Sequence, residues 1–276
     1  MTTPIITFTS DFGTKDYFVG AFKGRIYGAL NKVNLVDITH GIAPFSITEA
    51  AYVITNAYKH FPKGTIHIIA VDAEWSIENK HLVVLLNGHY FICADNGILS
   101  ILLTNSRPDN VVEIDLPTKN ESYFMANFVN AATHLAKGKE MSSIGKSITE
   151  IAKIKEMQPI FKPEANQLIG NIIYIDNFGN VISNIDFETF EAARKGRNYE
   201  IKIRRYSFNM LNINYNDIVN YNVPVNERKD DGKALALFNS DNLLEIAIYR
   251  SNLDTVGGAS SLLGVKYRDT ITISFS

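Results

Sequence analysis

The sequence predicts an N-terminal α/β domain with a mainly parallel central sheet, followed by a smaller C-terminal β-barrel-like domain. In the first half, short strands rich in β-branched residues alternate with helical patterns, which implies right-handed crossovers and parallel pairing. After about residue 168, strand-like runs follow one another and helical periodicity is scarce, as in small barrels. The polar stretch between the halves holds two prolines. We therefore predict domains at 1–158 and 168–276, joined by a linker at 159–167.

The first domain opens with a strand, a helix and a second strand. Residues 4–11 form an apolar run rich in β-branched side chains, which is typical of a buried strand. Residues 16–31 place apolar side chains at helical spacing. Residues 33–40 then read as the next strand. This order is the start of a parallel α/β unit.

The second helix has a recognisable beginning. Ser46 is followed three residues later by Glu49, which is a capping-box pattern, so we expect a helix to start there. Residues 64–72 form the third strand. Two apolar runs then flank Asn87-Gly88, the strongest short signal for a hairpin, and the pairing is expected to become antiparallel at this point.

A further strand at 111–116 and a helix at 128–139 complete the predicted first domain. The last turn of this helix carries lysines, which suit the negative end of the helix dipole. The strand-like runs of the second domain are LIGNIIYIDNFGNVISNI, NYEIKIRRYSFNML, KALALFNS, LLEIAIYR and DTITISFS.

Composition excludes several classes of function. The 276 residues carry a formal net charge of −2 with a pI near 6.3, which gives no electrostatic footprint for nucleic acid or an anionic membrane. A single cysteine rules out an intramolecular disulfide, and the six histidines show no metal-ligand spacing, so no metal is expected. The N-terminus lacks a signal-peptide pattern and no stretch is long and apolar enough for a membrane helix. We expect a cytoplasmic protein.

Polar residues follow several of the predicted strands. Asp11 lies at the carboxyl end of the first strand, the edge at which open α/β sheets bind ligands, and a carboxylate there can hold a ribose diol. The alternative is that Asp11 caps a turn or a helix. Asp72 ends the third strand in the same manner. In the second domain, residues 175–185 place an acid, an aromatic side chain and two asparagines around Gly179, which suits either a ligand site or a bulged hairpin.

Seven segments in order across nearly the whole chain resemble one family. The segments are ITFTSDFGTKDYFVGAFKG, VDITHGIAPFSITEAAYV, FPKGTIHIIAVD, ADNGILS, AATHLAKG, IDNFGNVISNI and LLEIAIYR. They resemble the S-adenosyl-L-methionine (SAM) hydroxide adenosyltransferases, relatives of the SAM-dependent fluorinase and chlorinase.

The resemblance implies that SAM is the substrate and that no separate cofactor is used. It implies cleavage at C5′ of the ribose to adenosine and methionine, in a homotrimer whose sites lie between subunits. Asp11 matches the acid that holds the ribose diol, and Ser240 matches a contact to the methionine carboxylate. The other residues in matching substrate-binding segments are Asp16, Phe45, Asn96, Asp176, Phe178 and Asn180.

The nucleophile is expected to be water or hydroxide rather than a halide. An acid at Asp72 would repel a halide 4 Å away by about 4 kcal/mol at an effective dielectric constant near 20. In the hydroxide enzymes this Asp precedes Pro-Gly-Val-Gly and acts with an arginine and a histidine. Here Asn79 stands at the arginine position with Lys80 beside it, and Tyr123 stands where the histidine belongs. The four residues after the acid are Ala73, Glu74, Trp75 and Ser76.

Three outcomes follow from these replacements. Lys80 can supply the charge of the arginine from one position away. Asp72 and Tyr123 can hold the water between them, with Asp72 as the base. In the third outcome the nucleophile site is lost, Trp75 fills it, and the protein binds SAM or adenosine without turnover. SAM hydrolysis is the leading hypothesis, binding alone is the second, and halogenation is the third.

Overall fold

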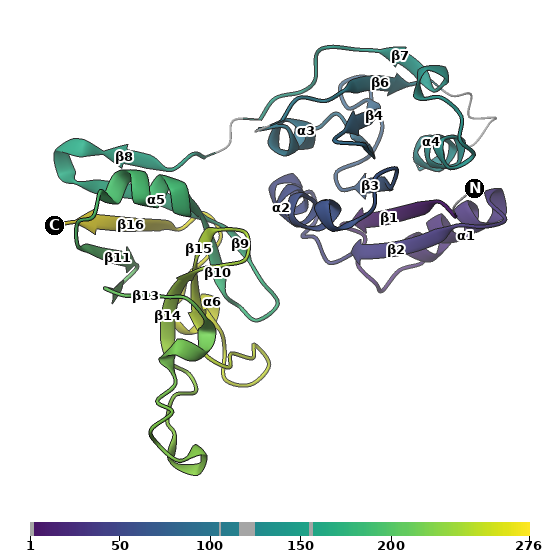
Figure 1. Ribbon diagram of the computed structural model, residues 1–276. Coiled ribbons are helices and arrows are strands. Elements are labelled where there is room, and N and C mark those ends of the chain that lie inside the picture. Colours follow the sequence, from purple (N-terminus) through teal and green to yellow (C-terminus); the bar gives the residue numbers. More distant parts are fainter. Residues whose placement is uncertain (1–2, 105, 116–124, 155–156) are drawn as a thin grey trace. The chain divides into compact units, whose positions relative to one another are not determined.

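The computed structural model describes residues 3–104, 106–115, 125–154 and 157–276 (Figure 1). The chain separates into two compact units, residues 1–155 and 156–276. Tyr123, one of the predicted catalytic residues, lies outside the described residues. No helix in the described ranges is both long and apolar enough to cross a bilayer.

The N-terminal unit is built on a seven-stranded sheet. The strands in their spatial order are β2 (Asn34–Thr39), β1 (Ile5–Ser10), β3 (Ile66–Ala70), β5 (His89–Ala94), β4 (His81–Leu86), β6 (Asn110–Ile114) and β7 (Gly145–Ser147). Strand β1 is parallel to β2 and β3, and β3 is parallel to β5. The pairings of β4 with β5, β4 with β6 and β6 with β7 are antiparallel.

The sheet is therefore mixed, and the prediction of a mainly parallel sheet needs correction. The reason is the hairpin at Asn87-Gly88, where both residues have positive φ, 54° and 82°, as a tight two-residue turn requires. The turn itself was predicted correctly. Because it reverses the chain, β4 runs against its neighbours, and β6 and β7 continue the alternation.

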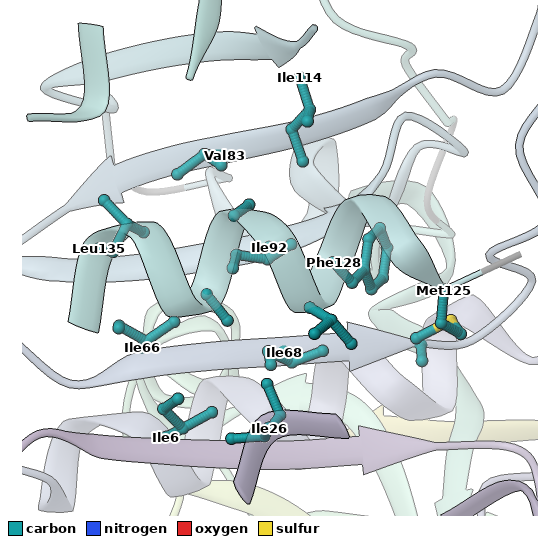
Figure 2. Close-up of a cluster of buried hydrophobic side chains, with 14 of the residues drawn as sticks. Ile6, Ile26, Ile66, Ile68, Val83, Ile92, Ile114, Met125, Phe128 and Leu135 are labelled. Carbon is teal, nitrogen blue, oxygen red and sulfur yellow. The ribbon is translucent and has the colours of Figure 1, made fainter. Parts of the chain in front are cut away.

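Helices cover both faces of this sheet. On one face, α1 (Phe18–Ala29) and α4 (Ala126–Ala136) contribute to a single apolar cluster with the strands. Figure 2 shows α4 with Phe128 and Leu135 among side chains of the sheet such as Ile66, Ile68 and Ile92. On the other face, α2 (Ile47–Ala57) and α3 (Ile98–Leu102) pack in a second cluster. Two short 3₁₀ helices, η1 (Tyr58–His60) and η2 (Met141–Ser143), complete the unit.

Helix α2 begins where the sequence predicts, with Ser46 at the N-cap, but the predicted capping box is wrong. The Ser46 side chain makes no capping hydrogen bond. The Glu49 carboxylate accepts instead from the Ala43 N–H at 3.1 Å. The glutamate thus supports the loop that precedes the helix rather than the Ser46 backbone.

The C-terminal unit is a near-barrel sheet of nine strands, mostly antiparallel. The strands are β8 (Ile160–Lys162), β9 (Gln167–Ile175), β10 (Val181–Asp186), β11 (Tyr199–Ile203), β12 (Tyr206–Phe208), β13 (Leu211–Asn212), β14 (Ala234–Phe238), β15 (Leu243–Ile248) and β16 (Thr270–Phe275). Strand β8, which pairs with β9, falls in the stretch predicted as a linker.

Short helices connect the strands of this second unit. They are α5 (Phe187–Arg194), α6 (Ala259–Leu262), η3 (Pro163–Ala165), η4 (Tyr215–Ile218) and η5 (Val225–Glu227). The Asp186 side chain caps α5 by accepting from the Thr189 N–H. The core includes the fully buried Leu168, Ile185 and Ile246, and Phe190 of α5 packs against it.

Candidate active site

The strand order places a ligand-binding edge in the N-terminal unit. From β1 the chain passes through α1 to β2 on one side, then through α2 to β3 on the other side of β1. Open α/β sheets bind ligands at the carboxyl ends of the strands that flank such a change of direction. Ser10, the last residue of β1, pairs with Ala70, the last residue of β3. Asp11 and Asp72 therefore follow neighbouring strand ends.

The Asp11 carboxylate connects three loops at this edge. Its Oδ2 accepts from the N–H of Phe45 at 2.9 Å and from the N–H of Asp72 at 3.3 Å. Phe45 follows β2 and Asp72 follows β3, so all three parallel strand ends meet at one carboxylate. Within the described ranges, Asp11 Oδ1 has no hydrogen-bond partner and stays available to a ligand.

Asp72 has a left-handed backbone with φ of 47°, which is uncommon for a residue other than glycine. Its carbonyl oxygen accepts from the side-chain amides of Asn79 and Asn96, both at 3.1 Å. Its N–H is bound to Asp11. The Asp72 side chain is half-buried, and we find no hydrogen bond to its carboxylate among the described residues. The backbone is thus tightly held while the acid is left unpaired.

The loop after Asp72 closes on itself. Ser76 Oγ accepts from the N–H of Asn79 at 2.9 Å, and the Ser76 N–H donates to the Asn79 carbonyl at 3.1 Å. At the tip of the loop, Trp75 is 54% exposed and Ile77 is 82% exposed. Within the N-terminal unit, Trp75 therefore does not fill a closed pocket.

Lys80 forms an ion pair with Glu113 rather than a contact with Asp72. Its Nζ lies 2.8 Å from Glu113 Oε2 on β6, in a partly exposed ion pair. His81, the next residue, is buried, and its Nε2 lies 2.9 Å from the carbonyl oxygen of Ala73. Burial lowers the pKa of His81, against the opposing effect of that carbonyl. A neutral ring donating from Nε2 supports the base of the loop.

The remaining predicted residues of the N-terminal unit lie at the same edge with different exposure. Phe45 is 73% exposed and has φ of 64°, and Asp16 is exposed just before α1. Asn96 is half-buried, and both ends of its side-chain amide contact the backbone. Besides the Asp72 carbonyl, its Nδ2 donates to the Val71 carbonyl at 3.0 Å, and its Oδ1 accepts from the Ile98 N–H at 3.2 Å.

Ser10, His40 and Asp37 form an arrangement that sequence reasoning did not anticipate. Ser10 Oγ lies 2.8 Å from His40 Nδ1, and His40 Nε2 lies 3.1 Å from Asp37 Oδ1. The second pair is within ion-pair distance, but it lacks the angles of a hydrogen bond. The order imitates a hydrolase triad. Because Ser10 is fully buried, the set supports the end of β1 and is closed to a substrate.

In the C-terminal unit, a tight turn carries the predicted binding residues. Asp176 Oδ1 accepts from the N–H groups of Phe178 at 2.9 Å and Asn180 at 2.8 Å. Asp176 Oδ2 accepts from the Asn180 side-chain amide at 2.9 Å. Gly179 in the turn has φ of 77°. Asn180 is 4% exposed and its Oδ1 has no partner, whereas the Phe178 ring is 59% exposed.

Glu245 on β15 is a buried acid that sequence reasoning missed. It is 3% exposed and accepts from the Tyr215 hydroxyl at 2.7 Å and the Asn239 amide at 3.3 Å. Burial raises its pKa, with Asp176 and Asp241 adding to the effect against those two hydrogen bonds. Asn239 Oδ1 also accepts from the N–H groups of the turn that follows, at Asp241 and Leu243. Ser240 is exposed in that turn.

No group of His, Cys, Asp and Glu among the described residues could hold a metal ion. Each unit by itself instead carries at least one carboxylate, a side-chain amide and an exposed aromatic ring among its predicted site residues. Such groups suit a nucleoside or an amino acid, since carboxylates bind hydroxyl and ammonium groups and rings stack on flat bases.

Comparison with known proteins identifies the family. Residues 6–145 match the model of the SAM hydroxide adenosyltransferase N-terminal domain, and residues 170–272 match that of its C-terminal domain. An (R)-S-adenosyl-L-methionine hydrolase of Methanocaldococcus jannaschii is 30% identical over 98% of this chain and 96% of its own. A fluorinase of Actinopolyspora mzabensis is 26% identical over 72% of this chain and 77% of its own.

A solved structure has the same fold along its whole length. An uncharacterized conserved protein from Thermotoga maritima superposes with a TM-score of 0.82 at 27% identity, covering 98% of this chain and 99% of its own. The two domain models together span most of the sequence, and the resemblance drawn from the seven segments is confirmed. The chain belongs to the SAM hydroxide adenosyltransferase family.

Proposed function

We propose that the protein hydrolyses SAM at C5′ of the ribose to adenosine and L-methionine. The observation that carries the proposal is the pairing of Asp11 and Asp72 at one sheet edge, with a carboxylate oxygen of each unpaired among the described residues. One acid can hold a ribose diol while the other orients water. Membership of the family and the four curated relatives named (R)-SAM hydrolase support the same reaction.

The main contribution of the protein to this reaction is to position the water and SAM. The oxygen of water attacks C5′, the C5′–S bond breaks, and its electron pair stays on the sulfur of methionine. The sulfonium is already a good leaving group, so no acid is needed to protonate it. One proton of the water must leave, and the Asp72 carboxylate accepts it. Rate acceleration then comes from holding water, C5′ and sulfur in line.

The other predicted residues take binding roles in this proposal. Asp11 holds the ribose diol, and Ser240 contacts the methionine carboxylate. The Asp176 turn, through Phe178 and Asn180, holds the methionine and adenosyl portions. Asp16 and Phe45 line the same edge as Asp11. SAM is a substrate here, and no separate cofactor is proposed.

The test is direct. Purified protein is incubated with each sulfonium epimer of SAM, since the relatives are named for the (R) form, and adenosine is followed by chromatography. We expect adenosine and methionine in equal amounts, and a large fall in kcat to a low residual turnover in Asp72→Asn, which keeps the shape and tolerates the left-handed backbone. Asp109→Asn is the control, because Asp109 is exposed beside Leu85 at the opposite edge of the sheet. Turnover in Asp72→Asn equal to that of wild type refutes the role of Asp72.

A second candidate function is the binding of SAM or adenosine without turnover. The contact of Lys80 with Glu113 favours it, because the nearest candidate for the missing arginine charge is already neutralised. Calorimetry separates the two: tight binding with no adenosine formed supports binding alone. Chloride- or fluoride-dependent formation of a 5′-halogenated adenosine would support the third candidate, halogenation, which the Asp72 carboxylate disfavours.

The proposal extends to assembly and location. A homotrimer is proposed from the family resemblance, and light scattering of the purified protein tests it by giving about three times the mass of one chain. Cytoplasmic residence is proposed because the single cysteine is free and buried, as suits a reducing compartment. Cell fractionation with an antibody to the protein tests it.

A further inference from the structure

The backbone at Asp72 is held in a conformation that an aspartate seldom adopts. Its φ of 47° lies in the left-handed region, where a residue with a Cβ carries about 1 to 3 kcal/mol of strain. Such a conformation persists only when the surroundings determine it. In this chain the residues that follow are Ala73, Glu74 and Trp75, so glycine does not relieve the loop.

Both backbone groups of Asp72 are bound by side chains, one from the same loop and two from distant parts of the sequence. The carbonyl oxygen accepts two amide N–H groups, one from Asn79 and one from Asn96. The N–H donates to Asp11. The Asp72 N–H belongs to the peptide unit before its Cα and the Asp72 C=O to the unit after it. Because both units are held, φ and ψ of Asp72 cannot rotate freely, and these bonds set the direction in which its side chain leaves the backbone.

Two further hydrogen bonds within the loop fix the position of Asn79. Its N–H donates to Ser76 Oγ at 2.9 Å, and its amide also donates to the Glu74 carbonyl at 2.9 Å. It stands at the position where the resemblance predicts an arginine. The neighbouring Lys80 points to Glu113 instead. Of these two neighbouring residues, the uncharged Asn79 and not the cationic Lys80 is therefore the one bonded to Asp72.

We propose that Asn79 and Asn96 are positioning residues that act through Asp72, fixing its left-handed backbone so that the carboxylate faces the water. The inference rests on the proposed hydrolysis of SAM. It assigns neither asparagine a contact with the substrate. It also explains how the site can function with Asn79 in place of an arginine. Two side-chain amides bonded to the backbone carbonyl of Asp72 orient its carboxylate, and the charge of that carboxylate is left unpaired.

Steady-state kinetics of SAM hydrolysis test the proposal with Asn79→Ala and Asn96→Ala. We expect kcat to fall on the order of 10²-fold in each, as for a reacting group misplaced by about 1 Å, with KM for SAM changed less than about twofold because binding contacts remain. Asn171→Ala is the matched control. Its side-chain amide also donates to a backbone carbonyl, that of Arg268 at 3.1 Å, in the C-terminal unit, and its kcat should equal that of wild type.

A double-mutant cycle gives the decisive readout. In an Asp72→Asn background, adding Asn79→Ala should lower kcat by less than about twofold, because there is no carboxylate left to aim. Full multiplication of the two effects, or a rise in KM with unchanged kcat, overturns the proposal. Thermal melting of every variant identifies misfolding. If an alanine variant does not fold, the serine substitution at the same position, Asn79→Ser or Asn96→Ser, replaces it.

Crystal structures of the two alanine variants keep the proposal testable if wild-type protein shows no turnover. That result would defeat the proposed function by itself. The positioning role is then judged from the backbone: φ at Asp72 should leave the left-handed region in the variants. A value that stays near 47° in both would overturn the positioning role as well.

Discussion

A buried pair of histidines in the N-terminal unit should make the protein sensitive to acid. His67 on β3 is fully buried, with its Nδ1 2.8 Å from Thr7 Oγ1 and its Nε2 3.2 Å from His89 Nδ1. Its ring stacks on Phe91 at a centroid distance of 5.0 Å. Burial, with a smaller contribution from His89, lowers the pKa of His67 from 6.5 to about 3. The folded protein therefore keeps His67 neutral where the unfolded chain binds a proton.

The sign and size of the effect follow from this difference. A lowered pKa in the folded state contributes stability that is present above pH 6.5 and is lost as the pH falls toward the folded value. The drop from 6.5 to about 3 corresponds to at most about 5 kcal/mol. Between those limits the free energy of unfolding should fall by about 1.4 kcal/mol per pH unit for this one site.

The assay is urea unfolding from pH 7 to pH 4, followed by the fluorescence of Trp75, the only tryptophan of the chain. His67→Phe can keep the stack on Phe91, and although it leaves Thr7 without its partner, the readout is the slope against pH and not the absolute stability. We expect the slope to shrink by about 1.4 kcal/mol per pH unit. His60→Gln, at an exposed position, is the control. An unchanged slope in His67→Phe would refute the reasoning.

Three further predictions concern the C-terminal unit. Gly179→Ala should lower the free energy of unfolding by about 1 to 3 kcal/mol and weaken SAM binding as measured by calorimetry. The reason is that the new Cβ would lie 2.6 Å from Leu253 Cδ2, at a residue with φ of 77°. Unchanged binding would contradict this prediction. Glu245→Gln should raise the free energy of unfolding in urea above that of wild type at pH 8 but not at pH 4. The pKa of the Glu245 carboxyl is raised in the folded protein, so wild type loses stability as the pH rises. An equal loss of stability in the variant at both pH values would count against this reasoning. Phe190→Ala, at a side chain 1% exposed, should cost about 3 to 5 kcal/mol, whereas Phe187→Ala on the same helix, at 46% exposure, should cost much less.

Local patterns explain which parts of the fold could be predicted. The hairpin at Asn87-Gly88 depends on two adjacent residues and was correct. The strand ends at Asp11 and Asp72 were visible because each acid follows a run rich in apolar and β-branched residues. The sequence analysis expected antiparallel pairing from this hairpin onward, yet it still described the sheet as mainly parallel. The hairpin makes the pairings of β4 with β5 and β6 antiparallel, whereas β5 returns to pair in parallel with β3.

The bonds that shape the site could not be predicted in the same way. The Asp72 N–H and its acceptor on Asp11 are 61 residues apart in the chain, so nothing local indicates the contact. Glu245 was missed for a different reason. It is one acid within the apolar run LLEIAI, which reads as a plain strand. An acid flanked on both sides by buried apolar residues is itself the signal, since a buried carboxylate needs partners.

The loop after β3 takes its shape without glycine. Glycine reaches unusual backbone angles without steric cost, but it leaves the loop free to take others. This chain has Ala73, Glu74, Trp75 and Ser76 after Asp72, none of them glycine. Its loop is shaped instead by Ser76 and Asn79 within it and by Asn96 from the next strand end. Asn79 thus has two roles in this loop, because the same side-chain amide donates to the Glu74 carbonyl and to the Asp72 carbonyl.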